Sequence, residues 1–288
     1  MTLGGVRQWV RVSGADRQTV PLLCLHGGPG GNHWAFEWLV GPGLQTERTV
    51  IYHEQRGCGR SDAPTDAADY SIQRLVADLT ELTDILALPE VDLLGYSFGG
   101  GLALELARAQ PLRVRRVVAQ APEFSMSDPQ IVSSQLGGFL QVAEGEILEA
   151  IEAVVSGPVP AAQQLEQVWN VVDQQTVDRF LFQDPRFAAL NRQFWQESGL
   201  FNTGDMARAL NQQPPSDTPH HLDQVTAPVL IVAGRHDRNV PLESLESMVA
   251  TLPDARLNVF EHSAHFPDTE EAAGFVRTVL SFLDAEES

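Results

Sequence analysis

The chain has 288 residues, which fits one large α/β domain or a domain carrying an insertion. No stretch approaches the ~20 apolar residues that span a bilayer. The first residues lack the charged-then-apolar pattern of a signal peptide, so we expect a cytoplasmic protein that does not enter membranes. The formal net charge is −19 without a single lysine, which argues against nucleic acid as a partner. This charge would attract amine-bearing ligands, or it only keeps the protein in solution.

Two cysteines, Cys24 and Cys58, are too few for a disulfide framework and lack the spacing of metal ligands. Cys24 falls in an apolar run, where cysteine behaves as a small core residue. We therefore expect neither a metal nor an organic cofactor. The sequence contains no indication of the oligomeric state.

Predicted strands and helices alternate over the first 121 residues. Leucines recur at helical spacing in 71–86, and Ser71 can cap this helix. The predicted strands are 6–12, 19–25, 49–53, 91–94 and 114–121, and the predicted helices are 34–44, 71–86 and 102–109.

The alternation stops between Pro122 and about Thr226, where no clear strand is found. Helical runs occupy 131–142, 147–155 and 163–182, and a proline-rich junction at 214–219 ends the segment. Alternation then resumes, with strands at 228–233 and 255–260 and helices at 242–252 and 269–283.

This order of elements predicts an α/β fold with a mostly parallel central sheet and helices on both faces. We expect a core domain formed by residues 1–122 and 227–288. A helical cap domain, residues 123–226, would be inserted between them, because a lobe of about 100 residues can hold a small core of its own.

The segment GYSFG at 95–99 follows a predicted strand and precedes a predicted helix. In that context G-x-S-x-G is typical of a nucleophile elbow, a turn so tight that only glycine fits at its first and last positions. The turn would place the Ser97 hydroxyl at a helix N-terminus, where negative charge is favoured.

Three polar residues follow predicted strands and occur in the order Ser97, Asp237, His265. Parallel sheets form their sites at the carboxyl ends of the strands, so these side chains can meet. We expect Ser97 to be the nucleophile, His265 the base and then the acid, and Asp237 the group that orients the imidazole. Two alternatives stay open, with His262 as the base or Glu123 as the orienting carboxylate, whereas His236 is expected to face solvent.

The segment HGGPGG at 26–31 also follows a predicted strand. Its glycines let the backbone approach a substrate closely. We expect an oxyanion hole made by the N–H groups of Gly28 and Phe98. The side chain of His26 is expected to tie neighbouring loops together through hydrogen bonds.

The segments HGGPGG, EQRGCGRS, GYSFGG, GRHD and HSAHF together resemble the α/β-hydrolase superfamily. HGGPG followed by QRGCGRS is similar to the proline iminopeptidase branch of serine peptidases. The resemblance covers both halves of the predicted core. It implies an α/β-hydrolase fold with a helical cap, and release of an N-terminal residue, often proline, from short peptides.

The chain departs from that branch at three places. Glu54 stands where aspartate usually precedes QRG, Tyr96 and Phe98 flank the serine, and Ala264 precedes His265. Cap carboxylates of that family hold the free amine of the substrate, which implies such a role for Glu197. Trp169, Phe194 and Trp195 could wall a pocket for a proline-like ring.

The leading hypothesis is an aminopeptidase that acts on a small-molecule or short-peptide substrate through an acyl-enzyme. A carboxylesterase or another acyl hydrolase with the same triad is the alternative. A third possibility is a ligand receptor that keeps the hydrolase fold, because fold does not dictate function.

Overall fold

The computed structural model describes residues 1–124, 128–200, 202–212 and 221–285. In this part of the chain, seven strands form the central sheet in the order β3-β5-β4-β6-β7-β8-β9. Only β3 runs antiparallel to its neighbour, β5, and every other pair is parallel. The strands are β3 (Val10–Ser13), β4 (Leu22–Leu25), β5 (Val50–His53), β6 (Val91–Tyr96), β7 (Val114–Gln120), β8 (Val229–Gly234) and β9 (Ala255–Phe260).

Successive residues of these strands point to opposite faces of the sheet, and each face has its own hydrophobic core. In β4, Leu23 and Leu25 belong to one core, whereas Leu22 and Cys24 belong to the other. The strands β4 and β8 are apolar throughout because a parallel sheet is covered on both sides. A separate two-stranded sheet precedes them, formed by β1 (Thr2–Leu3) and β2 (Val6–Arg7).

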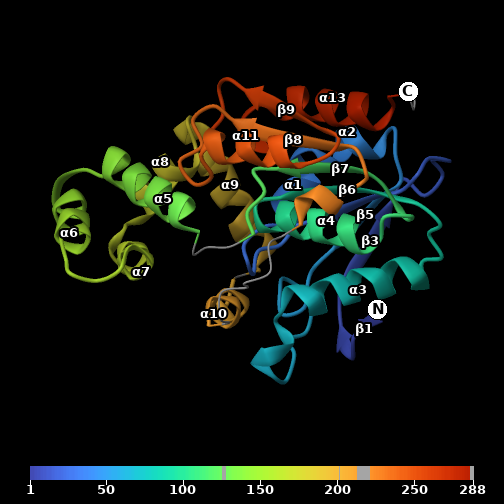
Figure 1. Cartoon of the computed structure of the whole chain (residues 1–288), viewed down its shortest axis with the longest axis horizontal. Helices are drawn as coiled ribbons and strands as arrows, with labels where there is room; N and C mark the ends of the chain where they lie inside the picture. The colour runs from blue at the N-terminus through green and yellow to red at the C-terminus, as the bar shows by residue number, and fades with distance from the viewer. Residues whose placement is uncertain (125–127, 201, 213–220, 286–288) are drawn as a thin grey trace.

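Helices cover both faces of the sheet (Figure 1). The first core receives leucines from three helices, α3 (Ile72–Ile85), α4 (Phe98–Ala109) and α11 (Leu242–Thr251). The second core receives side chains from α1 (Trp34–Leu39), α2 (Gly41–Gln45) and α13 (Ala272–Leu283). The mostly parallel sheet with helices on both faces agrees with the architecture predicted from the sequence.

Between β7 and β8 the described residues form helices and no strand. Buried side chains of the first four helices, among them Phe139, Ile151, Val168 and Phe180, form a third hydrophobic core. These four helices gather on one side of the molecule (Figure 1). The helices are α5 (Pro129–Val142), α6 (Gly145–Val155), α7 (Ala161–Val171), α8 (Gln174–Leu181), α9 (Pro185–Ser198) and α10 (Asp205–Asn211).

Several predicted elements are divided in the structure. The helix expected at 163–182 is two helices, α7 and α8, because the Asp173 side chain accepts the N–H of Thr176 and starts a new helix there. The helix expected at 34–44 is α1 followed by α2, and the closing helix is α12 (Pro267–Glu270) followed by α13. The strand expected at 6–12 is β2 followed by β3. Two short 3₁₀ helices, η1 (Ala67–Asp69) and η2 (Leu222–Gln224), complete the elements.

Ser71 caps α3 as expected, since its hydroxyl accepts the N–H of Arg74 at 3.2 Å. The prolines of the junction at 214–219 lie outside the described residues. Within the described ranges, no helix has both the length and the hydropathy needed to cross a membrane.

Candidate active site

Ser97 lies at the sharp turn between β6 and α4. Its φ of +53° is rare for any residue other than glycine. A Cβ on Gly95 would collide with the carbonyl of Gly99, and a Cβ on Gly99 would collide with the carbonyl of Leu25. The two glycines therefore permit the turn that places Ser97 immediately before the first residue of α4.

His265 and Asp237 are joined by a hydrogen bond of 2.9 Å between Nδ1 and Oδ2. The other carboxylate oxygen of Asp237 accepts the backbone N–H groups of Asn239 and Val240, at 2.8 and 3.1 Å. Both side chains are buried, with 4% and 2% exposed. A carboxylate at Nδ1 fixes the proton there, which leaves the lone pair on Nε2. His265 Nε2 lies 3.4 Å from Asn239 Nδ2.

The alternatives for the base and the orienting group do not form the contact that His265 and Asp237 make. His262 is exposed, and its backbone N–H donates to Glu271. His236 is exposed as well. Glu123 is buried on the wall of the cavity described below, but the carboxylate oxygen that contacts His265 Nδ1 belongs to Asp237.

A cavity of about 290 Å³ opens at the carboxyl ends of the strands, and both Ser97 and His265 line it. The helices of the insertion contribute to its other side. Polar side chains on the wall include Glu123, Gln135, Asn239 and Asp268. Aromatic side chains make up much of the remainder, namely Trp34, Phe36, Tyr96, Trp169, Trp195 and Phe266.

The backbone N–H groups of Gly28 and Phe98 are available beside Ser97. Phe98 is the first residue of α4, and the first N–H groups of a helix have no partner within it. Gly28 lines the cavity, and a Cβ on its neighbour Gly27 would lie 3.1 Å from Ser97 Cβ. Neither N–H group has an acceptor among the described residues.

The loop that carries Gly28 is held by His26, as the sequence predicted. The backbone N–H of Gln55 donates to His26 Nε2 at 3.1 Å, and the Gln55 side chain donates to His26 O at 2.9 Å. Burial lowers the pKa of His26 to about 4, so the ring is neutral and can accept this bond. On the other side of the loop, Asn202 Nδ2 donates to Pro29 O at 3.2 Å.

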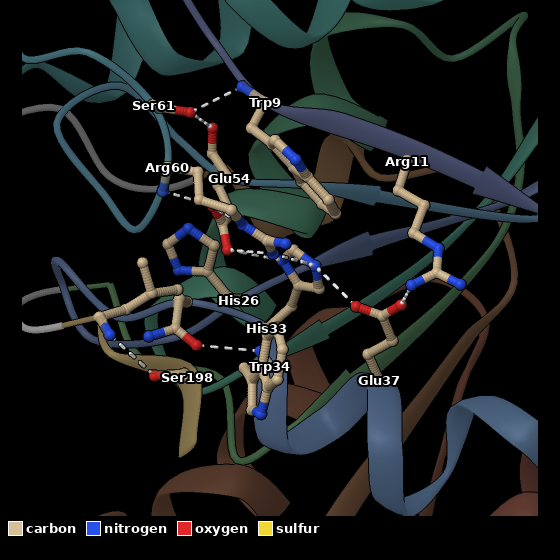
Figure 2. Close-up of polar contacts among 12 residues, drawn as sticks. Trp9, Arg11, His26, His33, Trp34, Glu37, Glu54, Arg60, Ser61 and Ser198 are labelled. Carbon is tan, nitrogen blue, oxygen red and sulfur yellow. Dashed lines mark hydrogen bonds and ion pairs between the residues drawn. The ribbon is translucent and has the colours of Figure 1, made fainter. Parts of the chain in front are cut away.

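A network of charged side chains lies beside His26, which begins this loop (Figure 2). The Glu54 carboxylate is fully buried and accepts the Arg60 backbone N–H at 2.6 Å and its guanidinium at 2.8 and 3.1 Å. His33 lies between Glu37 and Glu54, at 3.3 and 3.4 Å. The Arg60 guanidinium lies 3.5 Å from the centre of the Trp9 ring. Glu54, one of the departures from the family pattern, thus anchors the EQRGCGRS loop.

Three carboxyl groups influence His265. Burial alone would lower its pKa, but Asp237, Glu123 and Asp268 outweigh burial and raise the pKa above its ordinary value. Burial also raises the pKa of Glu123 to about 7 and that of Asp268 to about 6. The site therefore favours positive charge on His265 and on any ligand beside it.

The cap residues expected to contact a substrate divide into two groups. Trp169 and Trp195 line the cavity. Glu197 does not: its side chain is exposed and accepts a hydrogen bond from Gln193 at 2.7 Å. Residues two apart lie on different sides of a helix, so α9 turns Glu197 away when it turns Trp195 inward. The prediction that Glu197 holds the substrate amine is therefore corrected, because its carboxylate faces solvent.

The sequence analysis does not identify several polar residues of the cavity wall, among them Gln135, Asn239 and Asp268. The sequence indicates Glu123 only as an alternative partner for His265, although its place beyond a strand end also favours a site residue. Asn239 and Asp268 lie within three residues of Asp237 and His265, which was the available signal. Gln135 is one of several polar residues in α5, and no local pattern distinguishes it as a site residue.

Comparison with known proteins shows the family to which the chain belongs. A family profile described as the alpha/beta hydrolase fold matches residues 20–271. Proline iminopeptidase from Heyndrickxia coagulans is 27% identical over 268 residues, covering 92% of this chain and 91% of that protein. 2-Hydroxy-6-oxo-2,4-heptadienoate hydrolase from Pseudomonas putida is 31% identical over 295 residues, covering 99% and 95%.

The fold comparison agrees. A solved structure of a proline iminopeptidase-related protein from Thermus thermophilus has a TM-score of 0.78 at 21% identity, covering 97% of this chain and 94% of that one. The chain belongs to the α/β hydrolase fold family. Proline iminopeptidases among its relatives confirm the predicted resemblance, and the fold and the relatives' names together support a hydrolase.

Proposed function

We propose that this protein is a serine hydrolase in which Ser97 is the nucleophile, His265 the base and acid, and Asp237 the orienting carboxylate. We further propose that it is an aminopeptidase that releases an N-terminal residue from short peptides or aminoacyl amides. The hydrogen bond between His265 and Asp237 supports the first statement. The charge of the cavity wall supports the second.

In the proposed reaction, His265 Nε2 removes the proton of Ser97 Oγ while Oγ attacks the substrate carbonyl. The N–H groups of Gly28 and Phe98 donate to the oxyanion that forms. His265 then gives its proton to the leaving amine as the C–N bond breaks, which leaves an acyl-enzyme. A water molecule, deprotonated by His265, hydrolyses the ester and restores Ser97.

The proposal that the substrate has a free amine is supported mainly by the sign of the charge around Ser97. Two buried carboxyl groups, Glu123 and Asp268, line the cavity, and no arginine or lysine does so among the described residues. A substrate with a carboxylate, such as the heptadienoate named for the Pseudomonas putida relative, would meet like charge here. A substrate with a free ammonium group would meet opposite charge.

The test compares alanyl and prolyl p-nitroanilides with their N-acetylated forms. We expect kcat/KM to be about tenfold or more higher for the free amines, since a buried charged contact is lost on acetylation. Ser97→Ala should lower kcat about 10³-fold or more. Equal rates for free and acetylated substrates would refute the aminopeptidase.

A second candidate is an esterase for uncharged acyl groups. The aromatic side chains of the wall favour it, because such walls accept apolar groups without a charged partner. Short-chain p-nitrophenyl esters test it in the same assay. Faster turnover of these esters than of any arylamide, with no gain from a free amine, would select the esterase.

A further inference from the structure

Two buried side chains of the cavity wall carry an oxygen that has no hydrogen-bond partner among the described residues. These atoms are Oε1 of Glu123 and Oε1 of Gln135. The two side chains are only 7% and 2% exposed. Buried polar atoms in folded proteins almost always have partners. Two unpartnered acceptors on one cavity wall indicate that a bound molecule supplies the donors.

The two acceptors come from different parts of the fold. Glu123 follows β7, and its backbone N–H donates to the carbonyl of Ser97 at 3.3 Å, so it lies next to the nucleophile. Gln135 lies in α5 of the insertion. This helix contacts the loop after β8, because Ser134 Oγ donates to Arg238 O at 3.3 Å. The donor group would thus be held between the sheet and the insertion.

The chemistry of the two acceptors restricts the ligand. A carboxylate and an amide oxygen together call for a group with at least two N–H donors and a positive charge. The primary ammonium of an aminoacyl group has three such donors, and the secondary ammonium of a prolyl group has two. A hydroxyl has one donor and no charge, and a carboxylate has no donor and a negative charge.

We propose that Glu123 and Gln135 form the binding site for the free ammonium group of the substrate, an assignment that rests on the proposed aminopeptidase function. It replaces Glu197, which faces solvent. The ammonium would sit beside Ser97, as it must when the bond to be cleaved follows the first residue of a peptide.

The surroundings of Glu123 add a dependence on pH. Burial raises its pKa to about 7, His265 and the Asn239 amide oppose the rise, and Asp237 and Asp128 add to it. Asp128 begins α5, and the other three groups belong to the loops after β8 and β9. A bound ammonium favours the ionised carboxyl group, so amine binding should strengthen as pH rises through about 7.

The experiment measures amine binding without requiring amide cleavage. Hydrolysis of p-nitrophenyl acetate is inhibited with pyrrolidine, a secondary ammonium at pH 7.5, and with cyclopentanol, an uncharged ring of similar size. The variants are Glu123→Gln, which keeps the shape of the side chain, and Gln135→Met. Glu197→Gln is the matched control, because it removes the same charge from an exposed position outside the cavity. A thermal melt followed by circular dichroism reports whether each variant is folded.

We expect Ki for pyrrolidine to rise about tenfold or more in Glu123→Gln and about threefold in Gln135→Met. Ki for the uncharged cyclopentanol should change less than about twofold in both variants, since it lacks the ammonium group. KM for the ester should be unchanged in Glu197→Gln, which lies outside the cavity. Glu197→Gln should resemble wild type. The proposal is overturned if Glu123→Gln leaves Ki for pyrrolidine unchanged, or if wild type binds cyclopentanol as well as pyrrolidine.

The outcome is separable from that of the proposed function. An intact pyrrolidine site in an enzyme that does not prefer free-amine arylamides would refute the aminopeptidase and keep the amine site. A clear preference for free-amine arylamides that survives Glu123→Gln would keep the aminopeptidase and refute this site.

Discussion

Replacing Glu123 by glutamine should stabilise the protein at alkaline pH. Burial raises the pKa of this carboxyl group from 4.5 to about 7. Between these values the folded state holds a proton that the unfolded chain has released, so stability is lost as pH rises from about 4.5 through 7. Each pKa unit corresponds to about 1.4 kcal/mol, and the whole shift therefore costs about 3 kcal/mol. Glutamine does not titrate, so Glu123→Gln does not lose this stability as pH rises.

The assay is urea unfolding of wild type, Glu123→Gln and the control Glu197→Gln at pH 5 and pH 8. We expect the free energy of unfolding of Glu123→Gln, relative to wild type, to increase by about 2 kcal/mol from pH 5 to pH 8. Glu197→Gln should show no such change. If the free energies of unfolding of Glu123→Gln and wild type differ by the same amount at both pH values, the assignment of a raised pKa to Glu123 is refuted. If Glu123→Gln is more stable than wild type but binds amines more weakly, Glu123 resembles other functional residues that lower the stability of the folded protein.

The remaining predictions concern the triad and the turn that carries the serine. The acid limb of kcat/KM for an uncharged ester should have its midpoint above about 6.5, because neighbouring carboxylates raise the pKa of His265 and only the neutral ring can act as base; a midpoint well below 6 would contradict this. Asp237→Asn should lower kcat about 10⁴-fold with little change in the circular dichroism spectrum, because Nδ1 loses the acceptor that fixes its proton; a loss of under tenfold would argue against the triad. Gly99→Ala should give little folded protein in a thermal melt, since a Cβ would collide with backbone carbonyls of Leu25 and His26, and a normal melt would contradict the tight turn.

Much of the core could be predicted because its strands and helices correspond to local patterns in the sequence. The apolar runs of β4, β6 and β8 and the leucine spacing of α3 each identify one element. The G-x-S-x-G turn could be located because only glycine fits beside Gly99 O and Leu25 O. The pairing of His265 with Asp237 followed from their places beyond strand ends, where a parallel sheet brings distant segments together.

The insertion was less predictable for a physical reason. Its helices pack on one another and on the cavity, so the identity of the inward face depends on tertiary contacts that no local pattern reveals. Trp195 and Glu197 are two residues apart, and which one faces the cavity depends on how α9 is rotated about its axis. Gln135 has the same difficulty, because it is one of several polar residues in α5 and can be assigned to a site only once the cavity beside it is known.

The most direct test of the central claim is covalent labelling by a fluorophosphonate, which reacts with a serine only when a neighbouring base activates it. Wild type is treated and digested, and the labelled peptide is identified by mass spectrometry. The account predicts one adduct on Ser97, formed faster as pH rises through the pKa of His265, and lost in Ser97→Ala and His265→Ala. Labelling of another serine, or undiminished labelling of Ser97 in His265→Ala, would contradict it.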